Sequence, residues 1–191
     1  MRNKIPTITI IILILNILGF IYEHKIGENQ AAYTYAMYQG ALEDEQYLRI
    51  ITSAFMHYGI YHLACNMICL ISYGFDLENR IGSIKYALIY IAGIIGSALL
   101  INYTGGKHLH AGASGAIWAL MTATLIYNLR HGLNLANAFR GIILNLIYSF
   151  SAGVSWQGHI GGGIAGLLAA FALCGQQQEL HIDDGGNNTN P

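Results

Sequence analysis

One serine and one histidine in this chain have the setting that nucleophilic catalysis requires. Ser114 lies in the stretch Gly112-Ala113-Ser114-Gly115, at the start of an apolar segment that should form a helix to about residue 129. His159 follows Gly158 at the start of another apolar segment. A serine hydroxyl is a weak nucleophile until a neighbouring base takes its proton. If the two segments pack side by side, Ser114 and His159 can form such a pair.

The composition places these residues in a membrane protein. Hydrophobic residues make up 54% of the chain and charged residues 10%, whereas a soluble domain usually has about 25% charged residues. The formal net charge is −1 and no basic cluster stands out, so nucleic acid is not an expected partner. The three cysteines lie in apolar runs, which argues against a disulfide framework. We expect the lipid bilayer to surround the chain.

The hydropathy pattern predicts an all-α, multi-pass membrane protein with six membrane-spanning helices. These cover residues 5–22, 54–75, 86–103, 114–129, 141–154 and 158–174. The last three are short against the roughly 20 residues needed to cross a bilayer. Because Arg130 should lie at one surface, the helix of Ser114 should begin below the other, beside a water-filled cavity. The long first loop, residues 23–53, should have structure of its own, with short amphipathic helices at the interface.

The positions of Lys and Arg predict the orientation. If the N-terminus is cytoplasmic, six of the nine Lys and Arg residues fall in cytoplasmic segments and three in outer segments, which favours this orientation. Six spans then place the C-terminus in the cytoplasm too, in a plasma or inner cell membrane. His62, Asn66, Ser114 and His159 all lie in the outer half, where polar side chains tend to face a common cavity. Asn66 could instead serve only to link two helices by hydrogen bonding.

Small residues provide for close packing of the two helices that carry Ser114 and His159. His159, Gly162 and Gly166 are spaced to lie on one helical face. The two glycines form a Gly-x-x-x-Gly pattern, which lets helix backbones approach closely, and the small residues around Ser114 offer a matching surface. Trp118, one turn after Ser114, lies on the same face and could stack on the imidazole of His159.

At these residues the chain resembles the rhomboid family of intramembrane serine proteases. The family motifs are Gly-x-Ser before the fourth helix, His-x-x-x-Asn on the second, and Gly-His-x-x-Gly-x-x-x-Gly on the sixth. The matching residues are Gly112 and Ser114, His62 and Asn66, and Gly158, His159, Gly162 and Gly166. A Glu-x-Arg motif after the second helix matches Glu78-Asn79-Arg80. The resemblance covers about residues 5–174, and the length suggests the minimal bacterial form, with six helices and no added soluble domain.

The resemblance implies a serine endopeptidase that needs no cofactor and no metal. Ser114 would be the nucleophile and His159 the general base. The side chains of His62 and Asn66, with the backbone N–H of Ser114, would stabilise the oxyanion. Supporting positions would be Gly112, Trp118, Gly162 and Gly166. Its partners would be single-span transmembrane proteins, cut near the outer membrane boundary.

The acidic residues favour a dyad over a triad. No Asp or Glu falls in the outer half of any predicted span, which argues against a buried third acid and against an aspartyl protease. The zinc-protease motif His-Glu-x-x-His is also absent. Glu78 and Arg80 should form a structural pair at the membrane surface. The chain departs from the family pattern at Trp118, where tyrosine is common, and at Leu48-Arg49, where many members have Trp-Arg.

Two other functions stay open. A rhomboid-like module without catalysis would bind transmembrane clients, although such relatives typically lack the serine or the histidine. A histidine-lined metal transporter is the other alternative, since six of the eight histidines fall on or near the predicted outer side. Labelling by a serine-reactive probe tests the first, and hydrolysis in the presence of a chelator tests the second.

We expect residues 1–175 to form the membrane domain and residues 176–191 to form a polar, disordered tail.

Overall fold

The described part of the chain is all-helical. The computed structural model describes residues 5–149 and 154–175, so the predicted tail at 176–191 and the end of the fifth predicted span lie outside it. The helices are α1 (Thr7–Ile26), α2 (Glu28–Tyr35), α3 (Arg49–Thr52), the 3-10 helix η1 (Ser53–Phe55), α4 (Ile60–Ile81), α5 (Ser83–Thr104), α6 (Ser114–Arg130), α7 (Ala136–Ser149) and α8 (Trp156–Leu173).

Three of the six predicted spans, as far as the structure describes them, meet the length and apolarity needed to cross a membrane. Within the described residues, α1, α4 and α5 are long and apolar enough to cross a membrane. Helices α6 and α8 have 17 and 18 residues, which confirms that they are short, and α7 has 14 residues within the described part of the chain. The second span was wrong at both ends, because α4 begins only at Ile60 and continues to Ile81 rather than ending at residue 75. Gly59 precedes it with a φ of 84°, a conformation that suits glycine, and His57 therefore lies in the loop before the helix.

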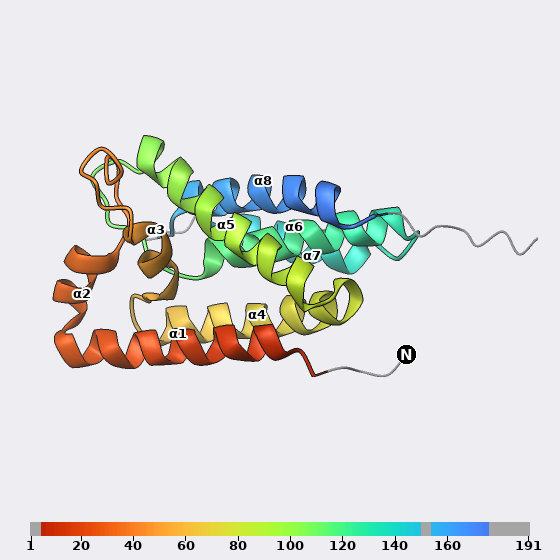
Figure 1. Cartoon of the computed structure of the whole chain (residues 1–191), viewed down its shortest axis with the longest axis horizontal. Helices are drawn as coiled ribbons and strands as arrows, with labels where there is room; N and C mark the ends of the chain where they lie inside the picture. The colour runs from red at the N-terminus through yellow and green to blue at the C-terminus, as the bar shows by residue number, and fades with distance from the viewer. Residues whose placement is uncertain (1–4, 150–153, 176–191) are drawn as a thin grey trace, which may run out of the picture.

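Helix α6 occupies the centre of the bundle. Ten of its residues are buried, from Gly115 through Ile126. Helices α5 and α8 pack against it and against each other, α4 packs on it from another side, and α1 lies outside α4 (Figure 1). Helix α1 begins and α8 ends at the same end of the bundle, and α2 and α3 lie at the other end. The helix that begins with Ser114 is therefore surrounded by protein.

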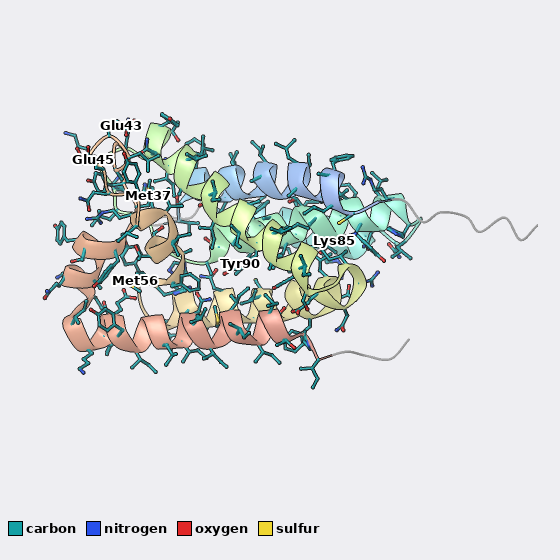
Figure 2. The ribbon with its side chains drawn as sticks, viewed as in Figure 1. Met37, Glu43, Glu45, Met56, Lys85 and Tyr90 are labelled. Carbon is teal, nitrogen blue, oxygen red and sulfur yellow. The ribbon has the colours of Figure 1, made fainter. Side chains whose placement is uncertain are left out.

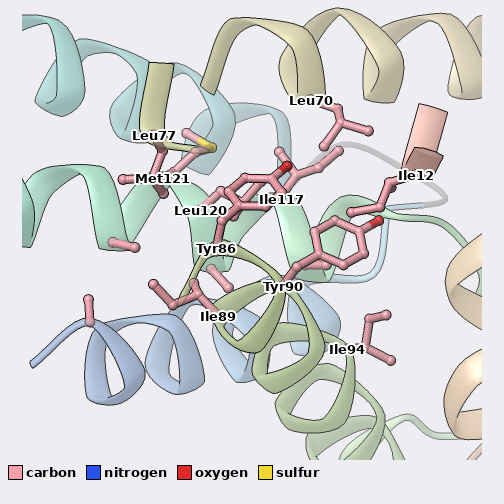
Figure 3. Packing of buried hydrophobic residues seen from close by; sticks show 14 of the residues in the cluster. Ile12, Leu70, Leu77, Tyr86, Ile89, Tyr90, Ile94, Ile117, Leu120 and Met121 are labelled. Carbon is pink, nitrogen blue, oxygen red and sulfur yellow. The ribbon is translucent and has the colours of Figure 1, made fainter. Parts of the chain in front are cut away.

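The bundle is apolar inside and outside. Figure 3 shows Tyr86, Ile89 and Tyr90 of α5 among side chains of α4 and α6 in the largest core cluster. Large apolar side chains also point outward, including Ile14, Leu18 and Ile21 on α1 and Ile164, Leu168 and Phe171 on α8. Soluble monomers rarely expose contiguous apolar surfaces of this extent. Such a surface suits contact with lipid.

Glycines bring α8 into backbone contact with its neighbours. A methyl group added at Gly162 would overlap the Gly115 backbone, and one at Gly166 would overlap the Ala119 backbone. On the other side of α8, a methyl group at Gly161 would overlap the carbonyl of Gly96. The predicted packing of the Gly-x-x-x-Gly face on the Ser114 helix is thus confirmed.

Gly162→Ala should destabilise the protein strongly. The new methyl group has no room beside the Gly115 backbone, and overpacking of this kind costs about 1–3 kcal/mol. Gly163→Ala is the matched control, because its methyl group would lie 3.6 Å from Thr122 and Trp118 side-chain atoms, an ordinary contact. Thermal unfolding in detergent should show a lower midpoint for the first variant only. Equal midpoints would contradict the packing argument.

Glu78 caps α1, and its predicted pairing with Arg80 was wrong. The buried Glu78 carboxylate accepts the backbone N–H groups of Ile8 and Thr9 at 2.9 and 2.8 Å, together with the Thr9 and Ser83 hydroxyls. These two N–H groups lie in the first turn of α1, which has no capping side chain of its own. Arg80 pairs with Asp76 at 2.7 Å instead, because residues four apart share a helix face and residues two apart do not.

The first loop has its own structure, as expected. Arg49 donates to the carbonyl oxygens of Ala36 and Tyr33 at 2.7 and 2.8 Å, while the Leu48 side chain stays 81% exposed. Asn102 of α5 accepts the Leu42 N–H at 3.0 Å. Figure 2 shows that the acidic residues Glu43 and Glu45 lie at this end of the bundle and Lys85 at the other. Arg49 therefore holds the loop together internally.

Candidate active site

The structure brings Ser114 and His159 into hydrogen-bonding contact. Ser114 is the first residue of α6, and His159 lies in the first turn of α8. The His159 Nε2 and Ser114 Oγ atoms are 2.9 Å apart, within the 2.6–3.2 Å that a nucleophile and its base require. His159 is 5% exposed and Ser114 is half-buried. The pair is thus shielded, yet the hydroxyl retains a path to a reacting group.

Tight packing on both sides holds this distance. The Gly162 contact with Gly115 lies one residue after Ser114 and one turn after His159. Trp118 stacks on the His159 imidazole with ring centroids 5.7 Å apart and planes 27° apart, as the sequence predicted. The indole restricts rotation of the imidazole, so Nε2 stays directed at Ser114.

His62 and Asn66 border the loop just before Ser114. A methyl group added at Gly112 would lie 2.8 Å from the His62 ring and 3.8 Å from Asn66 Nδ2. Gly112 also has a φ of 128°, which disfavours any other residue. The Asn66 amide donates to the His62 carbonyl at 3.0 Å, a bond within α4. This bond does not link two helices, and the Asn66 amide lies beside Gly112, two residues before Ser114.

Two residues at this site were missed by the sequence analysis. His57 is fully buried, lies edge-on to His62 with centroids 5.1 Å apart, and accepts the Ala113 N–H through Nε2 at 3.5 Å. Glu23 is 1% exposed, and its carboxylate accepts the backbone N–H of His57 at 2.8 Å. The expectation that no acid lies in a span near this site was wrong, because α1 continues to Ile26 and includes Glu23. The helix-start signal at Gly59 would have placed His57 in the loop.

A small cavity with both polar and apolar walls is lined in part by Ser114. It measures about 20 Å³ and its lining includes Ser53, Ser97, His110, Ser114 and Ser155. A space of this size suits about one water molecule when its walls are polar. The described residues contain no group of three or more His, Cys, Asp or Glu side chains that could hold a metal ion.

Residues 44–176 match the family model of the Rhomboid domain. The chain belongs to the rhomboid family. The matched range contains both residues of the Ser114–His159 pair and both His62 and Asn66, whereas α1 and α2 precede it. This rhomboid chain is a membrane protein with candidate transmembrane helices.

Two rhomboid proteases and a RHOMBOID-like protein from three organisms are similar to this chain. Rhomboid protease GluP of Bacillus subtilis is 34% identical over 90% of the chain, and Rhomboid-type serine protease 2 of Emericella nidulans is 31% identical over 71%. RHOMBOID-like protein 5 of Arabidopsis thaliana is 29% identical over 78%. The matches span 36%, 29% and 51% of the lengths of these relatives, respectively. The chain is thus homologous to rhomboid serine proteases over the shared membrane region.

Proposed function

We propose that this rhomboid-family chain is an intramembrane serine endopeptidase that uses a Ser114–His159 dyad. The observation that carries the proposal is the 2.9 Å contact between His159 Nε2 and Ser114 Oγ at the start of a buried helix. Homology to rhomboid serine proteases supports it independently. A fluorophosphonate probe tests it directly, because such a probe reacts with an activated serine and should label Ser114.

The geometry allows a two-step acyl transfer. Ser114 Oγ attacks the scissile carbonyl carbon while His159 Nε2 takes the hydroxyl proton. When the C–N bond breaks, His159 gives this proton to the leaving amine, and the acyl group remains on Ser114. Water then attacks the ester with His159 again as base, which releases the carboxylic acid and restores the hydroxyl. In this mechanism His159 needs its other ring nitrogen protonated, so that Nε2 has a free lone pair.

Three groups are proposed to stabilise the oxyanion. The backbone N–H of Ser114 lies at the N-terminus of α6, where helical N–H groups have no partner within the helix. His62 and Asn66 border the same loop beside Gly112. Donors directed at the developing negative charge are often the largest single catalytic contribution. Gly112 supports the site by making room for them.

The proposed orientation places the active site near the outer membrane surface. Helices α1, α4, α5, α6, α7 and α8 would be the six spans of one membrane domain over residues 1–175, with both termini cytoplasmic. The short length of α6 supports this depth, because Arg130 at the cytoplasmic surface leaves Ser114 below the outer one. The substrates would be single-span membrane proteins, cut near their outer boundary.

A cysteine at Lys107 should react with a membrane-impermeant thiol reagent added to intact cells, and one at Asn134 should not. The reason is the distribution of Lys and Arg, which favours a cytoplasmic N-terminus. Cys65, Cys69 and Cys174 are replaced by alanine in both variants, so that only the new thiol reports. The reverse labelling pattern would overturn the orientation.

Substrates whose transmembrane helix is hard to unwind should be cleaved slowly. A helical peptide bond must leave its helix before Ser114 can reach its carbonyl carbon, and alanine and leucine favour the helix more than glycine does. Cleavage rates are compared for a substrate series with Gly, Ala or Leu at the residues flanking the cut. Equal rates across the series would count against unwinding.

A further inference from the structure

A second histidine–serine contact lies beside the proposed dyad. His110 precedes Ser114 by four residues, and Ser155 precedes His159 by four. The His110 Nδ1 and Ser155 Oγ atoms are 2.7 Å apart, and His110 Nε2 lies 2.9 Å from the Gly105 carbonyl oxygen. A carbonyl oxygen only accepts, so Nε2 carries the ring hydrogen and Nδ1 accepts the Ser155 hydroxyl.

The Ser155 oxygen also accepts a hydrogen bond. Ser155 is the N-cap residue of α8, and its Oγ accepts the Gly158 N–H at 3.2 Å. Burial lowers the pKa of His110, so at neutral pH the ring has the uncharged form that this bond requires. His110 is 7% exposed and holds the Ser155 proton in a hydrogen bond, while the Ser155 oxygen caps a helix. Ser155 is therefore a structural hydroxyl and not a second nucleophile.

These bonds connect the two segments that carry the dyad. His110 lies in the loop that leads into α6, and its backbone pairs with that of Met37 through two hydrogen bonds of 2.7 and 2.8 Å. Figure 2 labels Met37 at the end of the bundle where Glu43 and Glu45 lie. Ser155 begins the helix of His159. The loop before Ser114 is thus tied to the first loop by its backbone and to the start of α8 by a side chain.

We propose that His110 and Ser155 are positioning residues, which hold the Ser114 loop against the start of α8 and thereby set the separation of Ser114 and His159. The inference rests on the proposed function of the dyad. Loss of the bond between them would let the two segments move apart without removing any reacting group. Displacements of about 1 Å in an active site can lower rates by about 100-fold.

Ser155→Ala should lower kcat by about 10- to 100-fold per folded molecule and leave KM unchanged. Ser155→Thr keeps the hydroxyl and should restore most of the rate. Gln157→Met is the matched control, because Gln157 donates to the Thr104 carbonyl at 3.1 Å and also ties the first turn of α8 to α5. Its kcat should be that of the wild type. A normal kcat in Ser155→Ala, or an equal loss in Gln157→Met, would overturn the proposal.

Ser155→Gly separates positioning from helix capping. Glycine is accepted at the N-cap and loses little stability against serine, whereas alanine loses more. If positioning is the role, both variants lose kcat to the same extent although their thermal midpoints differ. If capping is the whole role, kcat per folded molecule stays normal in both, and the proposal is wrong.

Nitrogen-15 NMR of the histidines gives a readout that does not need activity. In the wild-type protein His110 should be the Nε2–H tautomer, and its Nδ1 resonance should shift in Ser155→Ala and stay in place in Gln157→Met. A His110 ring protonated on Nδ1 would overturn the pair even in an active enzyme. If wild-type His110 has this tautomer but no serine probe labels the protein, the proposed function is wrong, and the positioning role is wrong with it.

Discussion

Ser114→Ala is expected to abolish both probe labelling and substrate cleavage. Removing the nucleophile of a well-studied serine protease lowers kcat by about 10⁶-fold, and removing its histidine costs about as much. His159→Ala should therefore fall in the same class, because an unassisted serine hydroxyl is a poor nucleophile. Fluorophosphonate labelling and cleavage of a transmembrane substrate, both measured in detergent, provide the two readings.

The control for this experiment is another helical serine. Ser72 donates to the Ile68 carbonyl at 2.7 Å on an exposed face of α4, away from the dyad. Ser72→Ala should label and cleave like the wild type. Labelling that persists in Ser114→Ala, or an intact wild type that does not react, would remove Ser114 from the role of nucleophile. Full probe labelling of His159→Ala, together with normal cleavage by this variant, would show that His159 is not the base.

Asn66→Ala should fold and label slowly, with a kcat lower by about 10²–10³-fold, because one oxyanion donor of a serine protease is worth that much. His62→Ala should lose a comparable amount. Ser114→Ala should remain far more severe than either, because neither His62 nor Asn66 is needed to generate the nucleophile. Turnover per folded molecule and the thermal midpoint are measured on the same purified protein.

Asn79 provides a matched control on the same helix. The Asn66 amide donates to the carbonyl four residues earlier at 3.0 Å, and the Asn79 amide makes the same kind of bond to Phe75 at 2.9 Å. Only Asn66 borders the Ser114 loop. Asn79→Ala should therefore retain normal turnover. If the two variants behave alike, with lower stability and unchanged turnover, Asn66 has no part in the active site.

The sequence by itself determined the features that follow from local spacing. Hydrophobic runs predicted the helices, and a four-residue interval placed His62 and Asn66 on one face. The spacing of His159, Gly162 and Gly166 predicted a packing face, and the structure seats this face on the helix of Ser114. These predictions succeeded because helix period and side-chain size are properties of a short segment. They did not depend on knowing how distant segments meet.

Only the tertiary structure decided which polar groups meet across long separations. Glu78 caps α1, which precedes it by about 70 residues, and Glu23 bonds to the backbone of His57, 34 residues later. His110 and Ser155 meet across 45 residues. A buried carboxylate or imidazole must find partners wherever helix packing places them, and that placement depends on interhelical contacts such as the Gly162 backbone contact. No local pattern in the sequence specifies these partners.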